Sequence, residues 1–252
     1  MMRVSRRSTL AWAAAAPFAL RGDRALAESL DDVRFTGWGR EAVTYLDLPP
    51  YYLSRDELRA LPLSPPPLNS SPATRAELDA LVRLEASRSA AETESIQRHL
   101  DYVPICMHFV NGDGRNFAAM PRTRALLEHI QLDIRWAVFQ AKNRFCRPRP
   151  DRLDSRIHPC IPVPPHPAYP SSHAALGCLL GRVVSVLARE GNDSLVALGF
   201  LMGREREVAG VHYPSDSVAG RALAEAVFLR FESSATYVSE LQAAKTEWAS
   251  RR

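Results

Sequence analysis

Apolar residues recur at helical spacing along most of the chain beyond residue 70. The first apolar stripe begins with Leu78, Leu81 and Leu84. It follows Thr74 and Glu77, whose spacing is typical of a capping box at the start of a helix. The pattern predicts one helix that begins near Thr74 and ends near residue 99.

The longest apolar stripe lies in the middle of the chain. It follows Pro121, a residue suited to the first turn of a helix, and the predicted helix carries Lys142 near its carboxyl end. Residues 101–120 have a mixed pattern, with a turn predicted at 111–114. The stripe consists of Leu126, Leu127, Ile130, Ile134, Val138 and Ala141.

Three further helices are predicted toward the carboxyl terminus, at about 171–187, 193–208 and 214–231. A loop at about 147–170, which contains eight prolines, precedes them. No alternating run of β-branched residues is long enough to require a strand. The pattern therefore predicts an all-α fold, a single-domain helical bundle.

The chain ahead of this bundle has a different character. Residues 28–70 are rich in proline and lack a clear period, which predicts an extended N-terminal arm with short turns. We therefore expect three parts: a segment of residues 1–27, the proline-rich arm of residues 28–70, and a helical domain of residues 71–252.

Residues 1–27 have the parts of an export signal peptide. Three arginines precede an apolar run at 10–20, and Ala-Leu-Ala at 25–27 supplies small residues for cleavage. The pair Arg6-Arg7 also resembles a twin-arginine signal. An uncleaved N-terminal anchor is the alternative. We predict a periplasmic or secreted protein.

Composition and charge exclude several partners. The chain has 252 residues, 46% of them apolar, and a formal net charge of +4. Because residues 1–27 contain five arginines and one aspartate, the remainder has equal numbers of basic and acidic side chains, and we predict no nucleic-acid partner. Beyond residue 27 there is no uninterrupted run of about 18 apolar residues, so we predict no membrane span in the mature chain.

Three polar blocks in the carboxyl-terminal half carry the candidate chemistry: KNRFCRPRP, YPSSH and EREVAGVHYPSD. Together they supply fixed positive charges, hydroxyls, imidazoles and a carboxylate, a set that suits a bound phosphate dianion attacked by histidine. The residues concerned are Lys142, Arg149, Pro150, Pro170, Ser171, Ser172, His173, Arg206, His212 and Asp216.

The spacing of these blocks resembles the signature of the type 2 phosphatidic acid phosphatase superfamily, K-x6-R-P, P-S-G-H and S-R-x5-H-x3-D. Two positions depart from it, because Ser172 replaces the usual glycine and Glu205 the usual serine. Within the superfamily the chain resembles the soluble, secreted bacterial class A non-specific acid phosphatases from about residue 45 to residue 231. The resemblance implies that residues 71–252 form an acid phosphatase-like catalytic domain.

Phosphoryl transfer depends mostly on positioning and charge stabilisation, which suggests a phosphate-binding set. Arg149 and Arg206 can each fork onto two phosphate oxygens, and Lys142 adds a compact charge. Ser171 and Ser172 open a predicted helix, where free N–H groups and the helix dipole favour an anion. We expect a modest change in site shape from serine at 172. Glu205 is harmless if it faces solvent and weakens the phosphate field if it points inward.

The catalytic set is His212, His173 and Asp216. His212 and Asp216 are four residues apart, so on a helix their side chains share one face, and Asp216 is expected to fix the tautomer of His212. We expect His212 to attack phosphorus, forming a phosphohistidine, and His173 to protonate the leaving oxygen. These roles match those that the family resemblance implies, and they favour activity below neutral pH. His166 is a further candidate for the pocket lining.

No cofactor and no metal ion are implied, because three fixed cations around the site would repel a metal ion. The cysteines leave two alternatives open: a disulfide between Cys146 and Cys160, which flank the proline-rich loop, or four reduced thiols if folding precedes export. Cys106 and Cys178 lie in apolar sequence and are expected to be buried thiols.

The leading functional hypothesis is a metal-independent acid phosphatase that hydrolyses small phosphomonoesters through a phosphohistidine. Three alternatives remain. A vanadium-dependent haloperoxidase resembles the phosphatases in needing the same cations and histidines, because vanadate mimics the phosphoryl transition state. A membrane-associated lipid phosphatase requires that the N-terminal segment stay attached. An inactive anion-binding helical protein requires that the site has drifted at Ser172 and Glu205.

Overall fold

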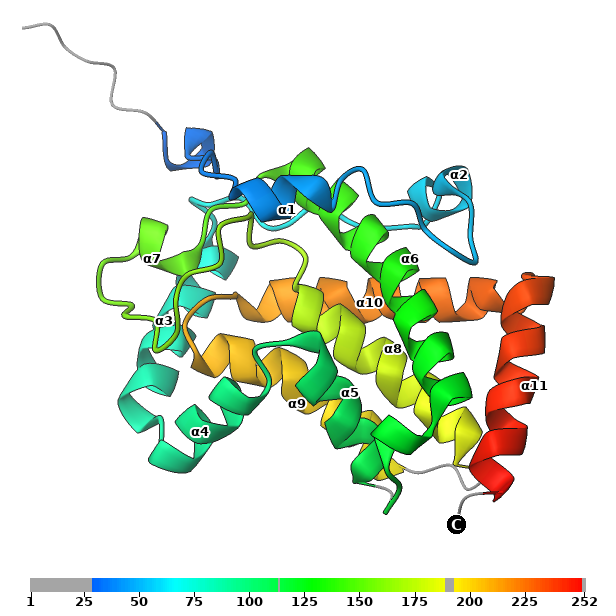
Figure 1. Ribbon diagram of the computed structural model, residues 1–252. Coiled ribbons are helices and arrows are strands. Elements are labelled where there is room, and N and C mark those ends of the chain that lie inside the picture. The colour runs from blue at the N-terminus through cyan, green and yellow to red at the C-terminus, as the bar shows by residue number, and fades with distance from the viewer. Residues whose placement is uncertain (1–28, 113, 189–192, 251–252) are drawn as a thin grey trace, which may run out of the picture.

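The computed structural model describes residues 29–112, 114–188 and 193–250. All regular secondary structure in these residues is helical, which confirms the predicted all-α fold (Figure 1). The export signal predicted at residues 1–27 lies outside the described residues. None of the described helices combines the length and apolar character needed to cross a membrane.

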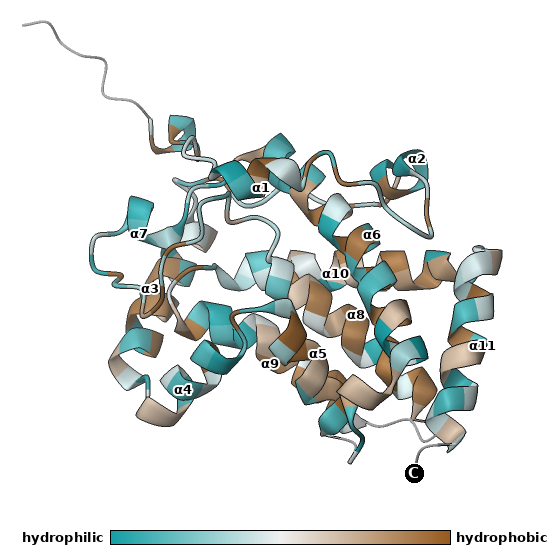
Figure 2. Ribbon diagram, in the orientation of Figure 1, coloured by the Kyte–Doolittle hydropathy of each residue, from teal (hydrophilic) through white to brown (hydrophobic). Residues whose placement is uncertain are grey.

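The bundle is built around α8 (Ser172–Leu187), which contacts α5 (Tyr102–Asn111), α6 (Pro121–Phe145), α9 (Asp193–Val208) and α10 (Pro214–Phe231). Most of α8 is apolar, as its brown colour in Figure 2 shows, and it buries side chains on nearly every face. A helix that is apolar all round belongs in the core, so α8 is the element against which the others pack.

The helices α8 and α9 cross at very short range because glycines face each other. A Cβ atom at Gly199 would lie 2.5 Å from the carbonyl oxygen of Gly177, and one at Gly177 would lie 2.6 Å from Cβ of Met202. Only glycine permits this backbone approach. The crossing carries the amino end of α8 beside the carboxyl end of α9, where the second and third sequence blocks meet.

The helix predicted from Thr74 to about residue 99 is two helices, α3 (Pro72–Ser87) and α4 (Ala90–Arg98). The interruption is a second start signal: Ser89 accepts from the N–H of Glu92, whose carboxylate accepts from the N–H of Ser89. This capping box begins a new helix within the apolar stripe. The cap of α3 is Ser71 rather than Thr74.

Two of the longer helices were not predicted. Residues 102–111, read as mixed, form α5, and the chain beyond Phe231 forms α11 (Ala235–Ser250), which packs on α6. In α11 only Tyr237, Ala244, Glu247 and Trp248 are buried, so its apolar stripe is sparse. The long helix predicted from Pro121, the three later helices and the turn at 111–114 are present as predicted.

The arm of residues 29–70 lies along the bundle with short helices η1 (Leu30–Asp32), α1 (Arg40–Thr44) and α2 (Arg55–Arg59). Asp133 of α6 fixes its course, because the buried carboxylate accepts from the backbone N–H groups of Tyr51, Tyr52 and Leu53 at 3.3, 3.1 and 2.8 Å. The arm is therefore extended, as predicted, but anchored by a buried acid.

The proline-rich loop between α6 and α8 contains one short helix, α7 (Pro150–Leu153). A short 3-10 helix, η2 (Phe117–Ala119), lies before α6. Cys106, Cys146, Cys160 and Cys178 are all free thiols in the structure. Whether Cys146 and Cys160 pair after export stays a prediction, and Cys106 and Cys178 are buried as expected.

Candidate functional site

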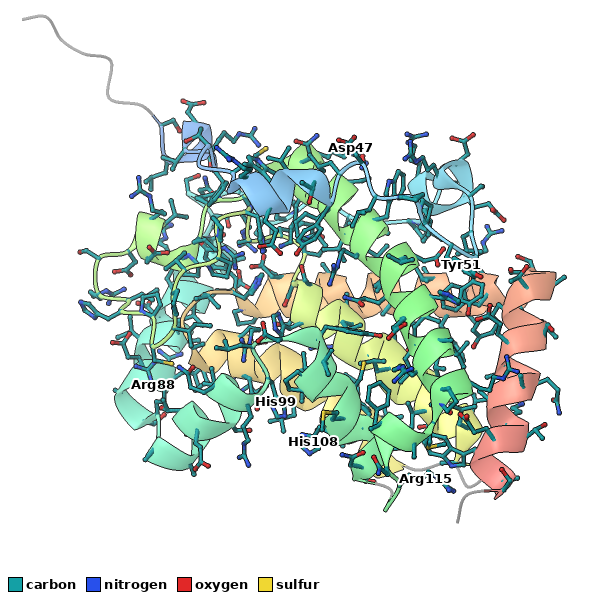
Figure 3. All side chains as sticks on the ribbon, in the orientation of Figure 1. Asp47, Tyr51, Arg88, His99, His108 and Arg115 are labelled. Atoms are coloured by element: carbon teal, nitrogen blue, oxygen red, sulfur yellow. The ribbon has the colours of Figure 1, made fainter. Side chains whose placement is uncertain are left out.

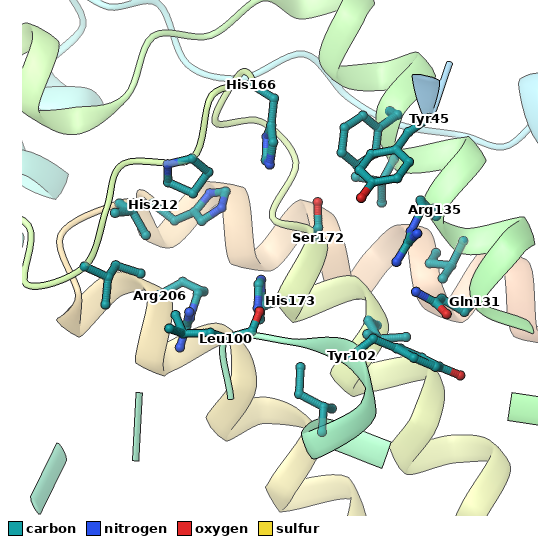
Figure 4. A pocket seen from close by; sticks show the side chains of 18 of the residues that line it. Tyr45, Leu100, Tyr102, Gln131, Arg135, His166, Ser172, His173, Arg206 and His212 are labelled. Carbon is teal, nitrogen blue, oxygen red and sulfur yellow. The ribbon is translucent and has the colours of Figure 1, made fainter. Parts of the chain in front are cut away.

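A cavity of about 280 Å³ opens where the three sequence blocks meet (Figure 4). Its polar end is lined by Ser172 and His173 of α8, by Arg206 of α9, and by His212 in the turn that follows α9. His166 of the proline-rich loop also lines this end, as the sequence suggested. Residues of the second and third blocks and of the proline-rich loop thus converge on one site.

His212 is fixed at both ring nitrogens. Nδ1 lies 3.0 Å from Oδ2 of Asp216, and Nε2 lies 3.0 Å from Nη1 of Arg149. A carboxylate accepts and a guanidinium donates, so the hydrogen of the neutral ring is on Nδ1 and the lone pair is on Nε2. Burial, and then Arg149, holds the pKa of His212 well below its ordinary value. His212 therefore presents an unprotonated nitrogen at the cavity.

Asp216 owes its charge to a residue that the sequence analysis did not identify. Nη1 of Arg147 donates to Oδ1 of Asp216 at 2.6 Å, and the backbone N–H of Tyr213 donates to Oδ2 at 3.1 Å. Burial alone would raise the pKa of Asp216, but Arg147 and His212 outweigh it and lower the pKa to about 2. The position of Arg147 inside the first block, between two prospective ligands, was the available signal.

His173 is the second buried imidazole of the cavity. Its Nε2 lies 3.3 Å from the carbonyl oxygen of Leu100, an acceptor, so this nitrogen carries the hydrogen. Burial, and then the charge of Arg206, lowers the pKa of His173 to about 3. In the unliganded site the imidazole is therefore neutral at moderately acidic pH.

The two serines at the start of α8 have different roles. Ser171 is fully buried and caps the helix, since its Oγ accepts from the N–H of Ala174 at 3.3 Å. Ser172 lines the cavity, and its buried Oγ has no hydrogen-bond partner among the described residues. An unpaired buried hydroxyl at a helix amino terminus is a ready donor to an anion.

Lys142 and Arg149 lie behind the cavity rather than in its lining. The three donors of Lys142 Nζ go to the carbonyl oxygens of Pro167, Ala168 and Pro170 at 2.7, 3.1 and 2.7 Å. Arg149 holds His212 and donates through Nε to the carbonyl oxygen of His166. In the structure Lys142 supports the loop before α8, and Ser171 supports the start of α8 itself. Direct contact of either residue with phosphate stays a prediction.

Arg206 reaches the cavity from α9. Its Nη2 donates to the carbonyl oxygen of Ile96 at 3.1 Å, and its buried Nε has no partner among the described residues. The neighbouring Glu205 neither faces solvent nor lines the cavity. It is buried between α4 and α9, where it accepts from Ser95 Oγ at 2.6 Å, pairs with Nδ1 of His99 at 2.9 Å, and lies 3.7 Å from Nη2 of Arg206.

The pair of Glu205 and His99 extends toward the surface. Nε2 of His99 lies 2.6 Å from Nδ1 of His108, and Figure 3 shows these two histidines side by side. The carboxylate that replaces the family's serine thus pairs with a buried imidazole and also with Arg206, whose charge it partly offsets, and it ties α4 to α9 beside the site.

Comparison with known proteins agrees with this arrangement. A family model described as the PAP2 superfamily matches residues 130–238, which contain all three blocks. The chain is 27% identical over 195 residues to a non-specific acid phosphatase of Salmonella typhimurium, a match that covers 73% of this chain and 78% of the relative. A non-specific acid phosphatase of Providencia stuartii is 33% identical over 82 residues, which cover 32% of this chain and 33% of that protein.

Solved structures share the fold at low sequence identity. A bacterial vanadium-dependent iodoperoxidase superposes with a TM-score of 0.61 at 14% identity, covering 82% of this chain and 62% of that one. A transmembrane PAP2-type phosphatidylglycerolphosphate phosphatase from Bacillus subtilis superposes with a TM-score of 0.50 at 15% identity, covering 77% and 93%. Residues 130–238 therefore match the PAP2 superfamily, as the motifs predicted, and the curated proteins to which the chain is similar include bacterial non-specific acid phosphatases.

Proposed function

We propose that this protein is a metal-independent acid phosphatase that hydrolyses small phosphomonoesters through a phosphohistidine. The observation that carries the proposal is the state of His212. Asp216 accepts the hydrogen of Nδ1, the unprotonated Nε2 accepts from Arg149, and the ring lines a cavity that Arg206 also lines. A neutral, oriented imidazole beside fixed positive charge suits attack on a phosphate ester.

In the first step the Arg149 guanidinium transfers its hydrogen bond from His212 Nε2 to a phosphate oxygen, and the freed lone pair forms a bond to phosphorus while the ester P–O bond breaks. His173 gives its proton to the departing oxygen, so an alcohol leaves and the phosphoryl group stays on His212. In the second step His173 takes a proton from water, the resulting hydroxide attacks phosphorus, and the P–N bond breaks. Inorganic phosphate and the free enzyme are regenerated.

The charges around the cavity support this sequence. Arg149 lies 3.0 Å from His212 Nε2, within reach of a phosphoryl group on that nitrogen. The unpaired Arg206 Nε and Ser172 Oγ provide two further donors at the cavity. Fixed donors at a site shielded from water stabilise developing charge most strongly, and they make a metal ion unnecessary.

The proton on His173 accounts for acid-favoured turnover. In the free site the pKa of His173 is lowered to about 3, because burial and Arg206 oppose a second positive charge. A bound phosphate dianion adds negative charge beside the ring and raises that pKa. Protonation therefore accompanies substrate binding, and it is favoured as the pH falls below neutrality.

The test is hydrolysis of p-nitrophenyl phosphate by the purified chain from pH 4 to pH 8, with and without EDTA and vanadate. We expect acid-favoured turnover that survives EDTA and is inhibited by vanadate. Replacement His212→Ala is expected to lower kcat by at least about 1,000-fold, as loss of a nucleophile does elsewhere. His158→Ala is the matched control, since the His158 side chain is 74% exposed.

Other outcomes identify the alternatives. Full retention of activity in His212→Ala would overturn the phosphohistidine. Bromide or iodide oxidation by the vanadate-loaded protein, without ester hydrolysis, would indicate a haloperoxidase. Phosphate binding without turnover would indicate an inactive anion-binding protein. We further propose export to the periplasm or beyond, on the sequence of residues 1–27.

A further inference from the structure

The cavity continues well beyond the phosphate-binding end. Past His173 and Ser172 its wall becomes apolar and aromatic, formed by side chains from α5, α6, α8 and the arm. An ester leaving group that points away from His212 enters this extension. The apolar wall includes Tyr45, Ile105, Ile134, Val138, Phe139 and Leu176.

Two polar side chains close the far end of this extension. Gln131 and Arg135 are four residues apart on α6, so they lie on the same face of the helix, and both line the cavity. Figure 4 shows them on the side of the pocket opposite His212 and Arg206, with Ser172 between. They are therefore positioned to meet a ligand group remote from the phosphate.

Arg135 lacks an ionic partner within the part of the chain that the structure describes. Its guanidinium lies over the ring of Tyr45, 4.6 Å from the centroid, and no carboxylate forms an ion pair with it. Glu41, the acid beside Tyr45, accepts instead from the Tyr45 hydroxyl at 2.7 Å. The ring orients the cation without neutralising it.

The other arginines at the site differ in this respect. Arg147 is neutralised by Asp216 and Glu77, and Arg149 donates to two carbonyls and two imidazoles. A half-buried guanidinium in a largely apolar cavity gains most from a planar anion that both of its edges can bond. Gln131 adds an amide donor and a carbonyl acceptor at the same place.

We infer that the preferred substrates are phosphomonoesters whose leaving group is apolar and carries a second anionic group at its far end. The ester phosphate meets His212 and Arg206, an aromatic or aliphatic body about one ring long fills the apolar extension, and a terminal carboxylate or similar anion binds Arg135 and Gln131. This inference rests on the proposed phosphatase function and names the substrate class of the same site.

A matched pair of esters tests it. We would compare 4-(2-carboxyethyl)phenyl phosphate with its primary carboxamide at pH 6, where the carboxylate is ionised. Two methylenes separate the varied group from the ring, so the leaving phenols have nearly the same acidity. We expect kcat/KM to favour the carboxylate by about 10- to 100-fold, the effect of a charge-assisted hydrogen bond, and mainly through KM.

Variants on one helix then assign the effect. Arg135→Gln is expected to bring the two esters within about two-fold of each other, mainly by lowering kcat/KM for the carboxylate. Arg124→Gln is the matched control, because Arg124 lies on α6 but is exposed and faces Glu128. Arg135→Lys keeps the positive charge but loses the paired N–H donors of the guanidinium, and it is expected to retain part of the preference for the carboxylate. It also serves if Arg135→Gln does not fold.

The outcomes separate this inference from the proposed function. Hydrolysis of both esters without a preference for the carboxylate, or a preference that survives Arg135→Gln, would overturn the substrate class and leave the phosphatase intact. If no ester is hydrolysed, the phosphatase proposal fails. Calorimetric binding of 4-(2-carboxyethyl)benzylphosphonate against its carboxamide then decides the inference, and equal binding would overturn it.

Discussion

Arg147 shows how one side chain governs a reaction that it does not touch. It is 2% exposed, and it divides its guanidinium between Asp216 at 2.6 Å, Ser215 Oγ at 2.7 Å and Glu77 at 3.1 Å. Its charge keeps Asp216 ionised despite burial, and Asp216 in turn keeps the hydrogen of His212 on Nδ1. Arg147 is thus a positioning residue for the proposed nucleophile.

We expect Arg147→Met to lower kcat about 10- to 100-fold, the range seen when a residue behind a catalytic ligand is lost. Without the guanidinium the pKa of Asp216 rises from about 2, so the acid limb of the pH–rate profile moves toward neutrality. A merely structural role would lower activity at every pH without moving that limb. The exposed Arg152→Met is the control, and Arg147→Lys is expected to restore part of the rate.

At the residue scale, the motif residues were predictable but the division of labour among them was not. Spacing predicted that His212, Asp216 and Arg206 belong to one site, and in the structure His212 and Arg206 line one cavity while Asp216 bonds to Nδ1 of His212. Spacing did not predict that all three N–H donors of Lys142 bond to carbonyl oxygens of the loop. That arrangement depends on how residues 167–170 fold back against α6. Periodicity describes one element at a time, whereas such contacts join elements distant in sequence.

At the scale of elements, the crossing of α8 and α9 sets the width of the site. Gly177 and Gly199 let the two backbones touch, and Gly203 faces Ala174 one turn nearer the cavity. The same helices carry His173 and Arg206 at their adjacent ends. The distance between the proposed general acid and the phosphate-binding arginine therefore depends on residues that bear no functional group.

Gly199→Ala tests this dependence. In an open helix alanine would stabilise by about 1 kcal/mol, but here the added Cβ lies 2.5 Å from the Gly177 carbonyl oxygen. We expect a net loss of about 1–3 kcal/mol in the free energy of unfolding, measured by urea denaturation, together with reduced kcat/KM. Gly37→Ala, where no atom lies within 4 Å of the added Cβ, is expected to change neither quantity. A stabilised Gly199→Ala variant would contradict the close packing.

The elements that the sequence missed have a common physical cause. One apolar stripe spans α3 and α4, so only the local cap at Ser89 reveals the break between them. The helix α11 buries few residues, and its stability comes from contacts with α6 such as those of Glu247 with the backbone N–H groups of Arg122 and Thr123. Hydrogen bonds of this kind do not produce a periodic pattern of apolar residues in the sequence.

At the scale of the whole molecule, the fold holds several imidazoles neutral inside a cationic site. Burial and the charges of Lys142, Arg149 and Arg206 lower the pKa of His166, His173 and His212, to about 3 for His173. An unfolded histidine has a pKa of about 6.5. Below that pH these histidines bind protons in the unfolded chain but not in the folded chain. The free energy of unfolding is therefore highest above about pH 6.5 and declines on acidification.

Asp133 acts in the opposite direction. Burial raises its pKa to about 6, so it favours the folded state as the pH falls from about 6 toward its unfolded value near 4. It therefore offsets about one of the three histidines. Since three buried histidines oppose one aspartate, we expect the free energy of unfolding to decline as the pH falls from 6 to 5.

Removal of one buried histidine tests the balance. His166→Asn keeps an acceptor for Arg149 but cannot take up a proton in the unfolded chain, so the slope of unfolding free energy against pH is expected to fall by about 1.4 kcal/mol per unit. His158→Asn, at an exposed position, is the control and is expected to leave the slope unchanged. Urea denaturation between pH 5 and pH 6.5 measures both.

Phosphate should also flatten the wild-type curve, because the bound anion lets the buried imidazoles accept protons in the folded state. An equal slope in wild type and His166→Asn would show that this histidine is already free to titrate in the native protein.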